Sequence, residues 1–175
     1  MLRGGKPTVH DAGVPDPKFA RLLSRRFCEL RVQRDTRIIE LLVSLSDFRG
    51  RKRVLYFYPK ADTSGCTIEA KDFSKLAPAF AKAGAAILGV SADPVTKLDK
   101  FKAKYDLKIP LASDEGHEML NAYGVWAKKS LYGRSYMGIL RNTYLIGPDG
   151  KVTRVWEKVR VAGHAADVLE AAKEL

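Results

Sequence analysis

The sequence of 175 residues contains only two cysteines and three histidines, and it has no long uncharged apolar run. Cys28 and Cys66 lie far apart and form no C-x-x-C pair, so the chain shows neither a disulfide framework nor a zinc-binding pattern. The histidines lack metal-ligand spacing, and we expect no metal and no other cofactor. The best apolar run, residues 38–43, contains a charge and is far too short to span a membrane. These absences suit a reducing compartment, and we expect a cytoplasmic protein without membrane contact.

The chain is rich in positive charge, with a formal net charge of +11. Such a charge raises nucleic acid as a partner. The basic residues, however, are dispersed and alternate with acidic ones, as in residues 97–106, and no DNA- or RNA-binding motif accompanies them. This pattern is typical of solvated helix faces, so we expect no nucleic-acid partner.

The most informative stretch surrounds Cys66. The apolar run 54–58 predicts a buried strand, which Pro59 ends because it has no N–H for the sheet. Ser64-Gly65 is a turn signal, and a helical pattern follows from Thr67 to about Lys82. The apolar stripe expected on this helix consists of Ile68, Phe73, Leu76 and Phe80. Cys66 is therefore predicted at or just before the first helical turn.

This placement favours a reactive thiol. The first N–H groups of a helix lack intrahelical partners, and the helix dipole stabilises an anion there, so the thiolate is favoured. Thr63, three residues earlier, is able to aim its hydroxyl into the same pocket. The alternative is that Cys66 is an inert, small core residue, as many free cysteines are. A core cysteine, however, more often lies inside an apolar run than in a Ser-Gly turn.

The remaining elements alternate between strands and helices. Strands are expected at 85–90, 109–113, 141–146 and 151–156, and helices at 94–105, 118–123 and 164–173. Gly147-Pro-Asp-Gly150 predicts a hairpin between the last two strands, and residues 132–137 are expected to form a loop bordering the pocket. This order predicts an α/β fold with a mixed central β-sheet flanked by helices.

Pro59, Thr63 and Cys66 together form the spacing P-x-x-x-T-x-x-C, which resembles the active-site signature of peroxiredoxins. Residues 56–70 are similar to the subgroup called bacterioferritin comigratory protein, or peroxiredoxin Q. The resemblance continues, in the usual order, through residues 45–50, 89–93, 122–126, 136–138 and 141–146. It implies a thioredoxin-like fold over residues 44–175 and a thiol peroxidase that reduces hydrogen peroxide and organic hydroperoxides.

The resemblance also implies roles for individual residues. Cys66 would attack the peroxide and become a sulfenic acid, while Thr63 and Arg141 bind the peroxide oxygens and Pro59 shields the pocket. Without the resemblance, Arg141 reads as a strand-end arginine that faces water. Glu69 also matches the family, and either orients the arginine or faces solvent.

The chain departs from the subgroup at Lys71, where many members carry a resolving cysteine. We therefore expect a one-cysteine enzyme whose sulfenic acid is resolved by thioredoxin, glutaredoxin or a low-molecular-weight thiol. Cys28 is an alternative resolving thiol. We expect a monomer or a homodimer.

Residues 1–43 match the family poorly and are predicted to be an atypical, poorly ordered or unusually packed segment. Asp11 and Asp16 argue against a mitochondrial leader. A shifted reading frame is another explanation, which sequencing the transcript across Val43 would test. Two further readings of the chain stay open: a catalytically inactive thioredoxin-like interaction module, and a thiol-disulfide oxidoreductase, against which the missing C-x-x-C counts.

Overall fold

The computed structural model describes residues 31–32, 50–131 and 133–175. A mixed sheet of six strands, in the order β1-β4-β3-β2-β7-β8, forms its centre. In chain order the elements of this sheet and its helices are β1 (Arg31–Val32), β2 (Lys52–Phe57), α2 (Ser64–Lys82), β3 (Ala85–Ser91), α3 (Val95–Lys104), β4 (Leu111–Ser113), α4 (Glu118–Ala122), β7 (Asn142–Ile146), β8 (Val152–Trp156) and α5 (His164–Glu174).

Strand direction changes on both sides of the parallel centre. β2, β3 and β4 run parallel, as expected for strands joined through the helices α2 and α3. β7 pairs antiparallel with β2, and β8 antiparallel with β7, through the predicted hairpin. The expected mixed sheet flanked by helices is confirmed.

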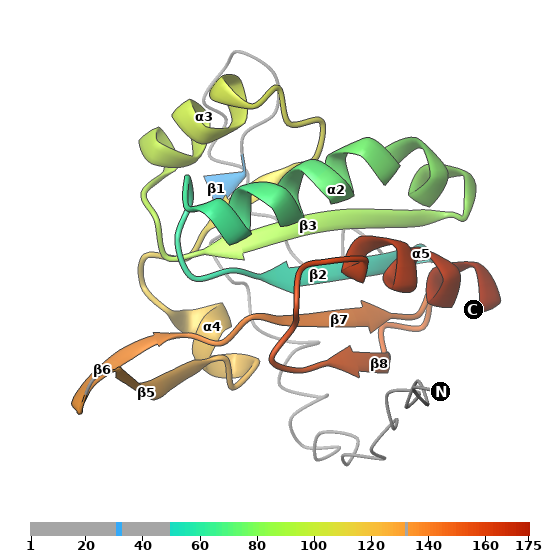
Figure 1. Ribbon diagram of the computed structural model, residues 1–175. Coiled ribbons are helices and arrows are strands. Elements are labelled where there is room, and N and C mark those ends of the chain that lie inside the picture. Colours follow the sequence, from blue (N-terminus) through green and yellow to red (C-terminus); the bar gives the residue numbers. More distant parts are fainter. Residues whose placement is uncertain (1–30, 33–49, 132) are drawn as a thin grey trace, which may run out of the picture.

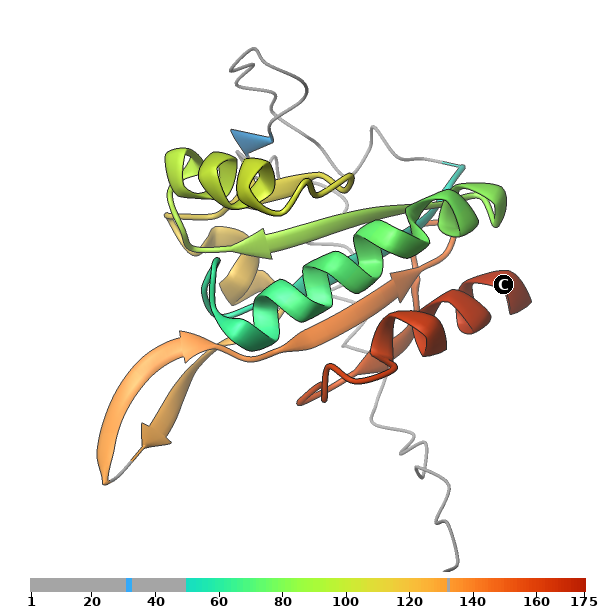
Figure 2. The same cartoon turned by 45° about the horizontal axis from the view of Figure 1, so that its top comes forward.

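The side chains of alternate residues in β2 pack into two separate hydrophobic cores, one on each face of the sheet. Val54 and Tyr56, with Tyr58 directly after the strand, point into the core beneath α2, α3 and α5. Leu55 and Phe57 point to the other face, into the core that includes residues of α4. Figures 1 and 2 show α2 lying across the first face and α4 on the opposite one. Because residues 54–57 of β2 are buried on both faces, they form a continuous apolar run rather than an alternating one.

The stripe predicted for α2 is partly wrong. Phe73 and Phe80 are fully buried, but Ile68 is 53% exposed. The buried face of the first turns is instead made of Cys66, Glu69, Ala70 and Phe73, which follow the i, i+3, i+4, i+7 spacing of one helix side. Glu69, an acidic residue, thus lies on the buried side of α2, whereas the sequence pattern predicted Ile68 on that side.

The loop expected at residues 132–137 is also wrong for the residues described. β5 (Trp126–Leu131) and β6 (Arg134–Ile139) form a separate two-stranded antiparallel sheet. This hairpin extends away from the central sheet (Figures 1 and 2). Gly133, with φ of 74°, lies in the connection between the two strands, where a left-handed backbone favours glycine.

Arg31–Val32 lie within the segment that we predicted to be atypical, and they pair antiparallel with β4. The rest of that segment, including Cys28, lies outside the described residues. The division of the chain near residue 44 therefore stays a prediction.

Candidate active site

Cys66 lies in the first turn of α2, at the end of the sheet where β2 and β3 finish. Thr63 is the N-cap residue, and the first helical hydrogen bond runs from the N–H of Thr67 to the carbonyl of Thr63 over 2.8 Å. The N–H groups ahead of Thr67 are therefore free of α-helical partners, beside a thiol that is buried. This is the position predicted from the sequence.

Arg141 reaches the thiol from the start of β7. Its Nη2 donates a hydrogen bond to Sγ of Cys66 over 3.2 Å. The antiparallel pairing of Phe57 with Asn142 explains the proximity, because it places the start of β7 beside the end of β2. The carbonyl of Arg141 also accepts a hydrogen bond from the N–H of Val159 over 2.9 Å, which fixes the backbone from which the side chain extends.

Glu69 holds the other side of the same guanidinium. Its Oε2 forms an ion pair with Nη1 of Arg141, and its side chain is only 1% exposed. Residues three positions apart are neighbours on a helix surface, so the Glu69 carboxylate and the Cys66 thiol share the buried side of α2. Of the two roles expected for Glu69, the structure shows that it orients the arginine and does not face solvent. The two terminal nitrogens of the Arg141 guanidinium contact Cys66 and Glu69, one residue each.

The electrostatics of this group are set by burial. Burial raises the pKa of Glu69 to about 7, although the charge of Arg141 and its hydrogen bond oppose the rise. Burial disfavours the charged form of Arg141, but Glu69 and Cys66 outweigh this effect and raise its pKa. Arg141 therefore remains a fixed cation between two groups that are able to carry negative charge.

Tyr56 is part of this environment and was not foreseen from the sequence. Burial, followed by the nearby Tyr58, Glu69 and Cys66, raises the pKa of its phenol. Its ring lies directly over Gly89 of the neighbouring strand, where an added Cβ would meet the Tyr56 ring and hydroxyl at 2.5 Å. Only glycine leaves room for the ring at this position of β3.

The other predicted residues lie around the thiol at different depths. Pro59 and Thr63 are exposed on the connection between β2 and α2. The Thr63 hydroxyl donates to the carbonyl of Lys60 over 3.0 Å. Lys71, where the sequence departs from the pattern expected from the resemblance, is exposed on α2. Arg141 thus contacts both Cys66 and Glu69, and Thr63 lies at the start of the helix that carries them.

The described residues contain no cluster of three or more histidine, cysteine, aspartate or glutamate side chains arranged to hold a metal ion. Among the described helices, none combines the length and the apolar character that a membrane crossing requires.

Comparison with known proteins agrees with this architecture. The AhpC/TSA family matches residues 31–155. Peroxiredoxin Bcp of Bacillus subtilis is 44% identical over 133 residues, covering 76% of this chain and 85% of the relative. Peroxiredoxin Bcp of Xanthomonas campestris is 49% identical over 124 residues, covering 71% and 78%.

Solved structures show the same fold. The bacterioferritin comigratory protein of Xanthomonas campestris, described for its alkyl peroxide reduction activity, has a TM-score of 0.73 and 46% identity, covering 75% of this chain and 84% of that one. A variant of PrxQ from Xylella fastidiosa has a TM-score of 0.75 and 38% identity, covering 83% and 87%.

The thioredoxin-like fold and these relatives define the class: a thiol-dependent peroxidase. Within that class the chain belongs to the AhpC/TSA family of peroxiredoxins, and its relatives are of the Bcp, or PrxQ, group.

Proposed function

We propose that Cys66 is the peroxidatic thiol, and the observation that carries this proposal is the hydrogen bond from Arg141 to Sγ in the first turn of α2. The Cys66 thiolate attacks the terminal oxygen of a hydroperoxide, and an S–O bond forms as the O–O bond breaks. Cys66 becomes a sulfenic acid, and the leaving oxygen takes a proton and departs as water or an alcohol. The cation of Arg141 stabilises the charge that develops on the departing oxygen.

Three neighbours support this step. Glu69 is a positioning residue, because its ion pair orients the guanidinium toward Sγ. Thr63, at the helix N-cap, binds the peroxide beside the thiol. Pro59, exposed directly after the end of β2, limits the access of water to the Cys66 thiol.

The substrates that we propose are hydrogen peroxide and organic hydroperoxides. The Xanthomonas campestris relative is described for its alkyl peroxide reduction activity. The family match over residues 31–155 includes the whole of β2, α2 and β7 of this chain.

For the second half of the cycle we propose an external thiol. The sequence resemblance places the resolving cysteine of many family members at the position of Lys71, and the other cysteine, Cys28, lies in the segment that matches the family poorly. An external thiol, such as that of thioredoxin, glutaredoxin or a small thiol, condenses with the sulfenic acid, releasing water and leaving a mixed disulfide that a second thiol reduces. A cytoplasmic monomer or homodimer would meet these reductants.

The test adds one equivalent of hydrogen peroxide to the reduced protein in the presence of a sulfenate trap and measures the intact mass and the peptide map. The expected result is trapping at Cys66 within seconds, and none in Cys66→Ser. A Cys28–Cys66 disulfide would replace the external thiol with an internal one. If Cys66 reacts no faster in the folded than in the denatured protein, the site is not activated, and the proposal fails.

A further inference from the structure

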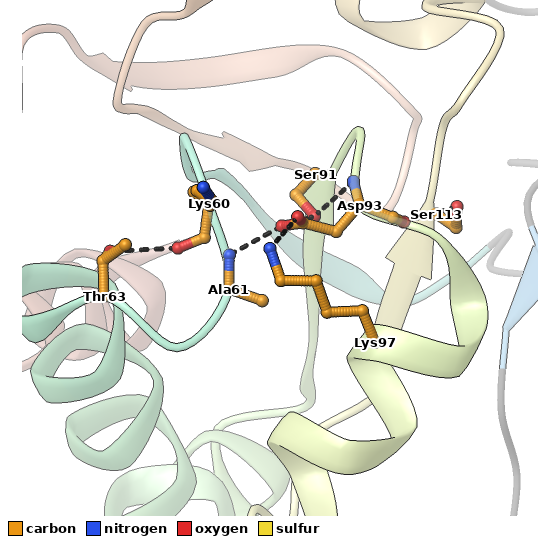
Figure 3. A network of polar contacts seen from close by, with 7 residues as sticks. All are labelled: Lys60, Ala61, Thr63, Ser91, Asp93, Lys97 and Ser113. Atoms are coloured by element: carbon orange, nitrogen blue, oxygen red, sulfur yellow. Dashed lines mark hydrogen bonds and ion pairs between the residues drawn. The ribbon is translucent and has the colours of Figure 1, made fainter.

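Residues 59–63, which we call the pre-cysteine loop, join β2 to α2, and one peptide group in this loop has both of its polar atoms engaged. The N–H of Ala61 donates to Oδ2 of Asp93 over 2.6 Å. The carbonyl of Lys60, in the same peptide group, accepts the hydrogen bond from Oγ1 of Thr63 over 3.0 Å. Figure 3 shows this chain of contacts running from Asp93 through the Lys60–Ala61 peptide to Thr63.

Asp93 itself is held from several elements. Its carboxylate accepts a hydrogen bond from Ser91 at the end of β3 and forms an ion pair with Lys97 of α3. Its backbone carbonyl accepts a hydrogen bond from Oγ of Ser113 in β4 over 2.7 Å. The Asp93 side chain is only 11% exposed. Asp93 is therefore a fixed point, and the pre-cysteine loop is the part that it holds.

A second contact anchors the same loop to α3. Asp62 has φ of 64°, a left-handed backbone that an aspartate tolerates better than most residues do. Its carboxylate binds the ammonium of Lys104 and accepts a hydrogen bond from the hydroxyl of Tyr105 over 2.6 Å. The loop is thus attached to the beginning of α3 through Asp93 and to its end through Asp62.

The contact with Asp93 has a chemical consequence at Thr63. An N–H bonded to a carboxylate polarises its peptide group, so the carbonyl at the other end becomes a stronger acceptor. The Thr63 hydroxyl has one proton, which it donates to this carbonyl, so Oγ1 offers only lone pairs to any other group. Thr63 makes no side-chain capping bond to α2. Its hydroxyl is therefore not occupied in capping the helix.

We propose that Asp93 is a positioning residue for the peroxide step, acting through the Lys60–Ala61 peptide to fix the Thr63 hydroxyl as an acceptor for the O–H of the hydroperoxide. The inference rests on the proposed function of Cys66. The acceptor orients the O–H, and thereby the O–O bond, in line with Sγ. Asp93 contacts neither the thiol nor the substrate, and its effect passes entirely through Thr63.

A double-mutant cycle tests this route. Asp93→Ala is expected to slow the oxidation of Cys66 by hydrogen peroxide by about tenfold, because a misplacement of 1 Å near the reacting atoms costs up to about a hundredfold. In the Thr63→Val background, where the hydroxyl is already absent, the same change is expected to cost less than about twofold. Alkylation of Cys66 by iodoacetamide, which carries no hydroperoxide O–H, is expected to change by less than about twofold in either variant.

The matched control is Glu170→Ala, which removes an exposed carboxylate from its ion pair with Lys173 on α5 and is expected to leave all rates unchanged. If Asp93→Ala does not fold, the cycle uses Asp93→Asn, with the same dependence on Thr63 expected. Equal losses with and without the Thr63 hydroxyl, or a parallel loss in alkylation, would assign Asp93 a purely structural role. Absence of Cys66 oxidation in the unmodified protein would instead overturn the proposed function, and this inference with it.

Discussion

The Nη2 atom of Arg141 lies 3.2 Å from Sγ of Cys66, although 75 positions separate the two residues in the chain. The sheet produces this contact. β7 begins where β2 ends, so a residue just before β7 meets the helix that follows β2. The side chain then binds Glu69 with its second terminal nitrogen, which fixes its direction. A flexible arginine is thus held with one donor on the thiol before any substrate arrives.

Replacement of Arg141 tests that contact. Arg141→Met removes both donors, and we expect Cys66 oxidation to slow by about a hundredfold or more, the size of effect seen when a transition-state donor is removed. Arg141→Lys keeps a charge but cannot reach two partners with a planar fork, so an intermediate rate is expected. Stopped-flow oxidation by hydrogen peroxide measures both. Arg134→Met, on the exposed part of β6, serves as the control, and a rate for Arg141→Met within about threefold of the parent protein would contradict the role.

The raised pKa of Glu69 predicts how the free energy of unfolding depends on pH. Its pKa is about 7 in the folded protein, because of burial, against an ordinary value of 4.5. Between these pH values the folded protein retains a proton that the unfolded chain has released, so this group lowers the free energy of unfolding as the pH rises from 4.5 to 7. The contribution is on the order of 3 kcal/mol. Urea unfolding of Glu69→Gln across this range should lose that slope relative to the parent protein, and an unchanged profile would refute the raised pKa.

The lowered pKa of His164 predicts a pH dependence of the unfolding free energy that is opposite in sign. It is buried, its Nε2 lies 2.8 Å from Oγ1 of Thr143, and burial lowers its pKa from 6.5 to about 4. The unfolded chain takes up a proton between these pH values that the folded protein does not, so stability is lost as the pH falls from 6.5 to 4. The loss is on the order of 3 kcal/mol.

His164→Gln keeps a hydrogen-bonding group near Thr143 and does not titrate. Relative to the parent protein, its unfolding free energy should therefore fall less on acidification, in contrast to Glu69→Gln. The two variants serve as controls for each other, because the same pH series must give differences of opposite sign. Differences of equal sign would contradict both assignments.

Gly89 makes a packing prediction. Gly89→Ala places a Cβ within 2.5 Å of the Tyr56 ring, so Tyr56 or the β2–β3 pairing must shift. We expect a loss of about 1–3 kcal/mol in the free energy of unfolding, as for other overpacked cores. Gly116→Ala, whose Cβ would meet nothing closer than 3.9 Å, is the matched control. Equal stability of the two variants in urea would show that the Tyr56 ring is free to move.

The sequence predicted the mixed sheet and the position of Cys66 because both depend on local signals. The apolar run of β2, the turn at Ser64-Gly65 and the helical pattern after it are each readable within a few residues. The hairpin of β7 and β8 was predicted for the same reason, from Gly147-Pro-Asp-Gly150.

The parts that were missed depend on contacts between distant segments. Glu69 is buried because Arg141, from another strand, supplies its counter-charge, and nothing in the sequence of α2 indicates that partner. Ile68 is exposed for the same reason, since Glu69 and Ala70 take the buried side of the turn. Asp93 lies in a stretch that resembles the family, but its partner Ala61 becomes visible only when the ends of β2 and β3 are side by side.

β8 forms one edge of the central sheet, and charged residues lie along it. No described strand pairs with its outer edge, and Val155 on this strand is 36% exposed. An open edge with apolar side chains invites another chain to add a strand. Arg154, whose guanidinium lies 4.9 Å from the ring centre of Trp156, and Lys151 just before the strand place cations along this edge. Charged side chains along an open edge disfavour its pairing with another strand, so Arg154, with the ion pair of Lys151 and Asp149, protects the protein against edge-to-edge aggregation.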